Sequence, residues 1–247
     1  MHAVSVGETR AVEPLIRALQ AHYPQHRILL THMTPTGRET GVGLFGDSVT
    51  RCYLPYDYPG ATKRFLAHYR PEAGLLIETE VWPNLIAAGV ALGIPLHLIN
   101  ARLSERSLRG YRRVGTLACD ALRGFSLIAA QTEADAQRLQ ALQAKHVVVT
   151  GNLKFDVDPP VQQVLLGLEL KRALAGRRVL LAASTREGEE ELLLDGVRQL
   201  AMHGALLVIV PRHPQRFDAV AAMVAERGLR LQRRSAGGTV DAATDVL

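Results

Sequence analysis

Short apolar runs alternate with longer amphipathic stretches along most of the 247-residue chain. Apolar runs bounded by turn residues are typical of buried strands, and apolar positions three and four residues apart are typical of helices. The repeated strand–helix order favours an α/β fold, in which helices cover both faces of a parallel sheet. Strands are expected at 4–6, 27–31, 51–55, 74–78, 95–100, 126–130 and 147–150, and helices at 12–22, 61–70, 83–92, 104–122 and 132–143.

The segment Asp156-Val-Asp-Pro-Pro160 interrupts this pattern. Two consecutive prolines break both helical and strand periodicity, so the segment is predicted to be a linker. We therefore expect two α/β domains in sequence, 1–156 and 157–247. The pattern restarts after the linker, with helices expected at 160–174, 187–202 and 214–227 and strands at 178–183 and 205–210. The second domain thus shows only two clear strand–helix units.

Composition narrows the choice of partners. A net charge of +5 is compatible with nucleic acid, a nucleotide or an anionic membrane surface. Aromatic residues make up only 5% of the chain, which argues against a stacking platform for single-stranded nucleic acid. The basic runs are short, as at Arg109, Arg112 and Arg113, and a solvated helix face explains them as well.

Several classes of protein are disfavoured by what the sequence lacks. Cys52 and Cys119 have no metal-ligand spacing, and we expect both to be reduced. No apolar stretch approaches the length of a transmembrane helix, and the first residues do not have the pattern of a signal peptide. The run Gly41-Val-Gly-Leu-Phe-Gly46 matches a dinucleotide fingerprint, but it neither follows a predicted strand directly nor has the required acidic residue about 20 positions later.

Carboxylates stand where predicted strands end. Glu8 follows Ser5-Val-Gly at a predicted strand–helix turn, and open α/β proteins bind ligands at the carboxyl ends of strands. There it can accept a proton from a substrate hydroxyl, or it can simply stabilise the start of a helix. If their strand persists, Glu78 and Glu80 lie on the same side of it. This pair suits acid–base work or stabilisation of positive charge on a sugar ring, and solvated capping residues are the alternative.

Other polar groups follow later strands. Lys154 lies in Gly-Asn-Leu-Lys-Phe-Asp, where it can neutralise a leaving phosphate or pair with a surface carboxylate. Ser184 and Thr185 form a turn that suits a phosphate, or that caps the next helix. Arg212 and His213 stand between two prolines. The arginine fork suits a phosphate or carboxylate, and the histidine can contact a nucleotide or act as a structural donor.

The order of these motifs is more specific than any one of them. They are HAVSVGE at 2–8, THMTPTGRE at 31–39, LPYDYP at 54–59, ETEVWPN at 78–84, NARLSERS at 100–107, GNLKFD at 151–156, the Ser-Thr-x-x-Gly-Glu-Glu turn at 184–190 and PRHPQRF at 211–217. Taken together, they resemble the bacterial Kdo transferases (3-deoxy-D-manno-oct-2-ulosonic acid transferases). The resemblance extends over nearly the whole chain.

The resemblance implies a GT-B glycosyltransferase fold, with two Rossmann-like domains and the active site between them. It makes 1–156 the acceptor-side domain and 157–247 a partial nucleotide-sugar donor domain. It further implies inverting transfer of Kdo from CMP-Kdo to a hydroxyl of a lipid A precursor (lipid IVA) in lipopolysaccharide core synthesis. No metal or other cofactor and no nucleic acid is expected. The implied location is an anionic membrane surface, the cytoplasmic face of the bacterial inner membrane.

Roles for four residues of the first domain follow from the resemblance. Glu8 matches the general base, which takes the proton of the acceptor hydroxyl as its oxygen attacks the anomeric carbon. Glu78 matches a carboxylate that supports the transition state, and Glu80 is its close neighbour. Lys154 lies in the motif linked to contacts with the donor and the leaving group.

The second domain matches the family's donor-binding motifs less completely. Arg212 and His213 match a segment that contacts CMP, and Ser184 and Thr185 lie in a turn that faces the phosphate. Arg186 stands where the family often has His. A hydrophobic N-terminal anchor and a glycine-rich nucleotide-binding segment have no counterpart, so we expect a chain truncated at both ends. The competing hypothesis is an inactive GT-B remnant that binds anionic lipid or a partner. A nucleotide-sugar epimerase of similar fold is disfavoured because no dinucleotide fingerprint stands in context.

Overall fold

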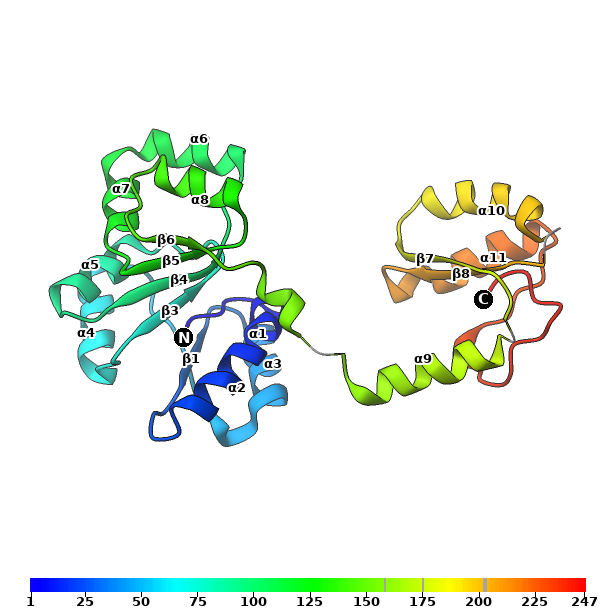
Figure 1. Cartoon of the computed structure of the whole chain (residues 1–247), viewed down its shortest axis with the longest axis horizontal. Coiled ribbons are helices and arrows are strands. Elements are labelled where there is room, and N and C mark those ends of the chain that lie inside the picture. The colour runs from blue at the N-terminus through cyan, green and yellow to red at the C-terminus, as the bar shows by residue number, and fades with distance from the viewer. Residues whose placement is uncertain (158, 175, 202–203) are drawn as a thin grey trace. The chain divides into compact units, whose positions relative to one another are not determined.

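A computed structural model describes residues 1–157, 159–174, 176–201 and 204–247. The chain divides into two compact units, unit 1 (Met1–Asp158) and unit 2 (Pro159–Leu247) (Figure 1). Each unit has its own parallel sheet and its own apolar clusters. The expected α/β fold class with parallel sheets is confirmed.

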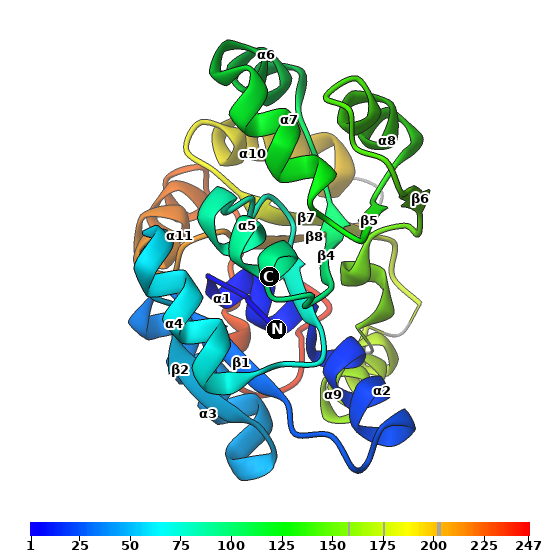
Figure 2. The same ribbon diagram turned by 90° about the vertical axis from the view of Figure 1, so that its left-hand side faces the viewer.

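The sheet of unit 1 is parallel throughout. Its strands are β1 (Leu29–His32), β2 (Thr50–Tyr53), β3 (Gly74–Ile77), β4 (Leu96–Ala101), β5 (Leu127–Ala130) and β6 (Val147–Val149). Strand β1 pairs with β2, and the others pair in the order β3-β4-β5-β6. His2 bridges Thr31 of β1 and Leu76 of β3. The first residues therefore lie between β1 and β3 and join the two halves of the sheet (Figures 1 and 2).

Local sequence signals set where the helices of unit 1 begin. These helices are α1 (Val6–Ala11), α2 (Glu13–His22), α3 (Pro35–Phe45), α4 (Pro59–Tyr69), α5 (Pro83–Ala91), α6 (Glu105–Val114), α7 (Thr116–Arg123) and α8 (Glu133–Gln140), with 3-10 turns η1 (Gly46–Ser48) and η2 (Leu153–Asp156). Proline occupies the first turn of α3, α4 and α5, where its missing N–H has no intrahelical role. Ser5, Thr34, Ser104 and Thr132 cap α1, α3, α6 and α8 with their hydroxyl oxygens.

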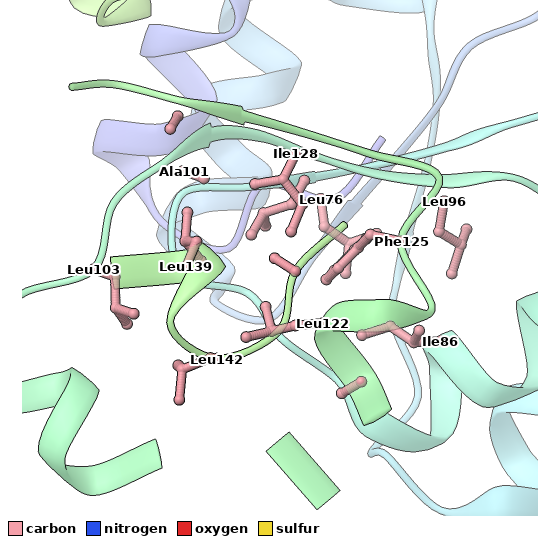
Figure 3. Packing of buried hydrophobic residues seen from close by; sticks show 14 of the residues in the cluster. Leu76, Ile86, Leu96, Ala101, Leu103, Leu122, Phe125, Ile128, Leu139 and Leu142 are labelled. Atoms are coloured by element: carbon pink, nitrogen blue, oxygen red, sulfur yellow. The ribbon is translucent and has the colours of Figure 1, made fainter. Parts of the chain in front are cut away.

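Strand alternation sends side chains to two apolar clusters, one on each face of the sheet. Leu76, Leu98 and Ile128 belong to the larger cluster, where they pack with buried residues of α4 to α8 (Figure 3). Leu30 and Ile77 belong to the second cluster, with residues of α2 and α3. Neighbouring residues of β3 thus point in opposite directions, as expected for a strand buried on both faces.

The strand predicted at 4–6 is wrong. Ser5 is the N-cap of α1, and Val6 is already the first residue of that helix. The extended residues lie slightly earlier, around His2. Ser5 and Glu8 have the Ser-x-x-Glu spacing of a capping box, which favours helix formation at this point.

Two helical predictions also need correction. Helix α3 was not expected, because Gly37, Gly41 and Gly43 lower its intrinsic helix propensity. The dinucleotide-like glycine run lies in the second half of α3 and the turn after it, away from any strand–helix turn. The single helix predicted at 104–122 is two helices, α6 and α7, separated by Gly115 with a φ of 67°.

Unit 2 is built around β7 (Val179–Thr185) and β8 (Leu206–Pro211), which pair in parallel. Its helices are α9 (Val161–Ala173), α10 (Glu189–Ala201) and α11 (Phe217–Glu226), with 3-10 turns η3 (Pro214–Arg216) and η4 (Arg234–Ala236). Val246 pairs in parallel with Leu207 of β8. A cluster of Leu194, Leu207, Val224 and Val246 packs α10 and α11 against this strand pair. Across the described parts of both units, no helix is long and apolar enough to cross a membrane.

Candidate active site

The carboxyl edge of the unit 1 sheet carries the polar residues predicted there. Glu8 lies in the first turn of α1, Glu78 follows β3 directly, and Lys154 lies in η2 after β6. Lys154 Nζ is 3.5 Å from Glu78 Oε1, although the two residues are far apart in the sequence. The charges of Glu8 and Glu78 help to raise the pKa of Glu80. The fold therefore brings together Glu8, Glu78, Glu80 and Lys154, which we call the carboxylate cluster.

Glu8 is held by hydrogen bonds within its own turn. The Val4 N–H donates to Glu8 Oε2 at 2.7 Å, and the Ser5 hydroxyl donates to Oε1 at 3.1 Å. Burial raises the pKa of Glu8 most strongly, the bonds from Val4 and Ser5 oppose this rise, and the charge of Glu78 adds to it. The half-buried Glu8 thus caps a helix and also remains a carboxylate of raised basicity. The two interpretations of its sequence position are compatible.

Glu78 is an anion placed between two cations. It is only 8% exposed, and its Oε2 lies 3.4 Å from Arg102 Nε while its Oε1 faces Lys154. Its φ of 60° is left-handed, which is uncommon for a residue with a side chain and is found at functional sites. Sequence reasoning did not single out Arg102. Its place two residues after Asn100, near the end of β4, was the available signal.

Glu80 is positioned by a turn. The strand ends at Ile77, so the alternation expected to align Glu78 with Glu80 does not apply. Trp82 Nε1 donates to Glu80 Oε2 at 2.6 Å, and His2 Nε2 lies 3.8 Å from the same oxygen. Burial is the main cause of the raised pKa of Glu80, and the Trp82 hydrogen bond opposes it.

A network from three strand ends holds the Lys154 loop. The Leu153 N–H donates to Asn100 Oδ1 at 3.1 Å, and Asn152 Nδ2 donates to Gln131 Oε1 at the same distance. Asn152 Oδ1 accepts the N–H of Lys154 at 3.0 Å, which forms a turn closed by its side chain. Asn100, like Glu78, has a positive φ, of 56°. These bonds give a structural role to the asparagines of the NARLSERS and GNLKFD motifs, Asn100 and Asn152.

The start of α3 supports the Glu8 turn from the other side. The Thr34 hydroxyl donates to the Val4 carbonyl oxygen at 2.9 Å. A Cβ on Gly37 would lie 2.7 Å from that oxygen and 2.8 Å from Thr34 Oγ1. The close approach of α3 to the Glu8 turn therefore requires glycine at position 37.

Two hollows of unit 1 lie apart from the carboxylate cluster. One has a volume of about 510 Å³ and is lined by residues that include Tyr53, Tyr56 and Phe65. The other has about 800 Å³ and is lined by residues that include Ile86 and Phe125. The eight predicted site residues line neither hollow. Over the described residues, no group of three or more His, Cys, Asp or Glu side chains is arranged to hold a metal ion.

The predicted residues of unit 2 also gather at strand ends. Thr185 and Pro211 are register partners at the ends of β7 and β8, and the Arg212 N–H donates to the Thr185 carbonyl at 3.0 Å. Ser184, with a φ of 61°, is exposed, as are Arg212 and His213. The carboxyl edge of this sheet thus presents a hydroxyl, a guanidinium and an imidazole, a set of groups that suits a phosphate.

Helix capping by Ser184 or Thr185 is wrong. Helix α10 begins only at Glu189, and the Glu189 carboxylate accepts the backbone N–H of Arg186 at 2.8 Å. Behind this turn Glu190 is fully buried, and Arg216 Nη2 donates to it at 3.0 Å. The turn after β7 is therefore stabilised by the Glu189 carboxylate of α10, and the Ser184 side chain, near the end of β7, is exposed.

Comparison with known proteins places the chain in a family. A family model described as 3-deoxy-D-manno-octulosonic-acid transferase (kdotransferase) matches residues 1–157. The 3-deoxy-D-manno-octulosonic acid transferase of Bordetella pertussis is 47% identical over 96% of this chain and 57% of its own length. The Haemophilus influenzae transferase is 38% identical over 100% of the chain and 59% of its own length. The chain thus spans well under two thirds of these relatives.

Solved structures at low sequence identity share the fold. UDP-GlcNAc 2-epimerase from Neisseria meningitidis, bound to UDP-GlcNAc, has a TM-score of 0.60 at 15% identity, covering 92% of this chain and 70% of its own. A glycosyltransferase from Rickettsia africae has a TM-score of 0.59 at 12% identity, covering 92% and 64%. At such identities the likeness concerns the fold alone, whereas the family match rests on sequence. The chain belongs to the 3-deoxy-D-manno-octulosonic acid (Kdo) transferase family.

Proposed function

We propose that this chain forms the acceptor side and part of the donor side of an inverting transferase that moves Kdo from CMP-Kdo to a hydroxyl of a lipid A precursor (lipid IVA), in lipopolysaccharide core synthesis. One observation carries the proposal. In a chain of the Kdo transferase family, the half-buried Glu8 lies beside Glu78, which is itself paired with Arg102 and Lys154.

Glu8 is the proposed general base. It takes the proton of the acceptor hydroxyl as the hydroxyl oxygen forms a bond to the anomeric carbon of Kdo. The bond from that carbon to the phosphate oxygen of CMP breaks, its electron pair leaves with CMP, and a single displacement inverts the configuration. Burial raises the pKa of Glu8, which makes it a better proton acceptor than an exposed carboxylate, and the donors Val4 and Ser5 fix its direction.

The neighbouring charges suit the two ends of the breaking bond. The Glu78 carboxylate can stabilise positive charge that develops on the sugar ring, and Lys154 can neutralise negative charge on the departing phosphate. In unit 2, Ser184, Thr185, Arg212 and His213 are the proposed contacts for CMP. Side-chain cations supply the charge neutralisation in this scheme, and we propose no metal or other cofactor.

The acceptor is a lipid, so we propose that the protein works at an anionic membrane surface, the cytoplasmic face of the bacterial inner membrane. The net charge of +5 supports this location, because basic residues near an anionic surface contribute about 1 kcal/mol each to binding. We propose no nucleic acid partner.

Labelled CMP-Kdo and lipid IVA, incubated with this chain, test the transferase directly. Glu8→Gln keeps the shape of the side chain, and we expect it to slow transfer by about 10²- to 10⁴-fold. Glu13→Gln is the matched control, because Glu13 pairs with the exposed Arg17 on α2, outside the proposed site. Transfer by Glu8→Gln at the rate of the unmodified chain would refute the role of Glu8.

The alternative is a non-catalytic member of the family that binds anionic lipid or a partner. The same assay separates the two. No transfer by the unmodified chain, with sedimentation on vesicles that contain lipid IVA, supports the alternative.

A further inference from the structure

The three carboxyl groups at the sheet edge differ in what supports their charge. Glu78 faces two cations, at 3.4 and 3.5 Å. Glu8 accepts two hydrogen bonds, one from a backbone N–H and one from a hydroxyl. Over the part of the chain that the structure describes, the donor to Glu80 is one neutral group, the indole N–H of Trp82. When carboxylates share a site, mutual repulsion raises the pKa of the least supported member, which here is Glu80.

The Nε2 atom of His2 faces Glu80. His2 is 3% exposed, and its Nδ1 lies 2.9 Å from Thr31 Oγ1. The Thr31 hydroxyl also lies 3.3 Å from the Met1 carbonyl oxygen, to which it can only donate. If its one proton is directed there, Nδ1 is the donor to Thr31 and carries the imidazole proton. Nε2 then has only a lone pair. It is buried, has no hydrogen-bond partner among the described residues, and lies 3.8 Å from Glu80 Oε2.

Nε2 is buried, whereas 19% of the Glu80 side chain is exposed, and a buried acceptor left without a donor costs free energy. A proton between Nε2 and the Glu80 carboxyl group removes this cost. The proton does not belong to His2, because burial, the main cause, lowers the pKa of its imidazole to about 3. The chain's amino group and His32 also disfavour an imidazolium there.

The surroundings of Glu80 point the same way. Among the described residues, the titratable groups that act on Glu80 include His2, Glu8, Glu78 and Tyr111, and none of these four is a cation at neutral pH. Two of the four are carboxyl groups whose charges raise its pKa. The cations Arg102 and Lys154 pair with Glu78 instead. A proton on Glu80 therefore relieves repulsion and also fills the empty bond to His2.

We propose that Glu80 is a positioning residue and is the protonated member among the three glutamates of the carboxylate cluster. Its O–H is directed at His2 Nε2, and an oxygen of its carboxyl group accepts the hydrogen bond from Trp82. A carboxyl rotation that shortens the distance to Nε2 by about 1 Å gives a normal hydrogen bond. Glu8 and Glu78 are then the ionised members, and their two negative charges balance those of Arg102 and Lys154. The order of protonation stands on its own, and only its use, to keep Glu8 ready as a base, rests on the proposed function.

Carboxyl titration tests the order without any turnover. The chain is prepared with ¹³C in its glutamate side-chain carboxyl carbons, and Glu8→Gln, Glu78→Gln and Glu80→Gln assign the three signals. We expect Glu80 to have the highest titration midpoint, and Glu80→Gln to leave the midpoint of Glu8 unchanged because one neutral group replaces another. A higher midpoint for Glu8, or a fall in its midpoint in Glu80→Gln, overturns the proposal.

The ¹⁵N signals of His2 give a second measurement on the unmodified chain. We expect a protonated Nδ1 and a bare Nε2 at neutral pH, and a proton on Nε2, in the neutral or in the charged ring, overturns the proposal. In the transfer assay, Glu80→Gln should transfer Kdo at least about tenfold faster than Glu80→Ala. The amide of glutamine can donate to His2 and accept from Trp82, as a carboxylic acid does. Equal losses in the two variants contradict the neutral form. Since the NMR measurements need no catalysis, they determine the protonation state of Glu80 even in a chain that fails to transfer Kdo.

Discussion

Gly37→Ala should destabilise unit 1, although alanine is the better helix former. The added Cβ would lie 2.7 Å from the Val4 carbonyl oxygen and 2.8 Å from Thr34 Oγ1. The Val4 carbonyl also accepts the Thr34 hydroxyl, and the Val4 N–H donates to Glu8, so neither neighbour can withdraw without breaking a bond. Overpacking costs about 1–3 kcal/mol, and we expect the upper part of this range because the contact is with a backbone atom. Such a loss exceeds the gain of about 1 kcal/mol in helix propensity.

Gly43→Ala is the matched control within α3. Gly43 is exposed, and a Cβ built on it has nothing within 4 Å. Only the conformational term remains there, so the substitution should stabilise the unit by about 0.5–1 kcal/mol. The same chemical change should therefore have opposite signs at two positions six residues apart in one helix.

Urea unfolding followed by tryptophan fluorescence measures both effects. Trp82 is the only tryptophan of the chain and lies beside Glu80, so it reports on unit 1. With a slope of about 1–3 kcal/mol per molar urea, the midpoint should fall by roughly 1 M in Gly37→Ala and rise slightly in Gly43→Ala. A rise in both midpoints would show that α3 can move away from Val4 without lowering the free energy of unfolding, which would refute the reasoning about Val4. Gly37→Ala should also slow transfer, since the Glu8 turn moves with Val4.

Three further predictions concern individual carboxylates. Asp57→Ala removes the acceptor of two backbone N–H groups at the start of α5, which donate at 3.0 and 2.8 Å. It should lower the unfolding free energy of unit 1 by about 1 kcal/mol in the same fluorescence assay, and Asp57→Asn should lower it less. Arg216→Met leaves the buried Glu190 without its cation and should lower the unfolding free energy of unit 2 by about 3–5 kcal/mol. Amide exchange in α10 measures this loss, and the double variant Arg216→Met, Glu190→Met should recover most of it. The hydrogen bond from Arg230 holds the pKa of Asp245 below its usual range, so its stabilising contribution is full above about pH 4 and is lost as pH falls through the lower folded pKa. Asp245→Asn should remove that part of the acid dependence of exchange near Val246, and an unchanged dependence would count against the pairing.

Most strands could be predicted from the sequence because a parallel sheet covered on both faces needs continuous apolar runs. The errors have local physical causes. The strand placed at 4–6 fails because Ser5 and Glu8 cap a helix reciprocally, and two bonds outweigh a weak strand preference. Helix α3 was missed because its glycines permit close packing, which no propensity scale describes. The split at Gly115 needs a positive φ that the amphipathic pattern does not reveal.

The site could be predicted only in part. Glu8, Glu78 and Lys154 were found because each lies just after a strand or strand-like segment, and parallel strands end on one edge. The partners Arg102 and His2 were not found. Arg102 meets Glu78 only because β3 pairs with β4, and His2 meets Glu80 only because the first residues enter the sheet beside β3. Which strands become neighbours in a sheet is a tertiary property, which local sequence patterns do not encode.

The position of the first residues between β1 and β3 has a consequence for biosynthesis. Residues 1–3 leave the ribosome long before β3, which ends at Ile77, so one side of their slot does not yet exist. Closing such a distant contact is slow, because the chain loses loop entropy before the contact repays it. The turn that carries Glu8 therefore acquires its final surroundings only late in co-translational folding. A ribosome stalled ahead of β3 should display this turn in an unprotected form, open to proteases and to chaperones that bind nascent chains.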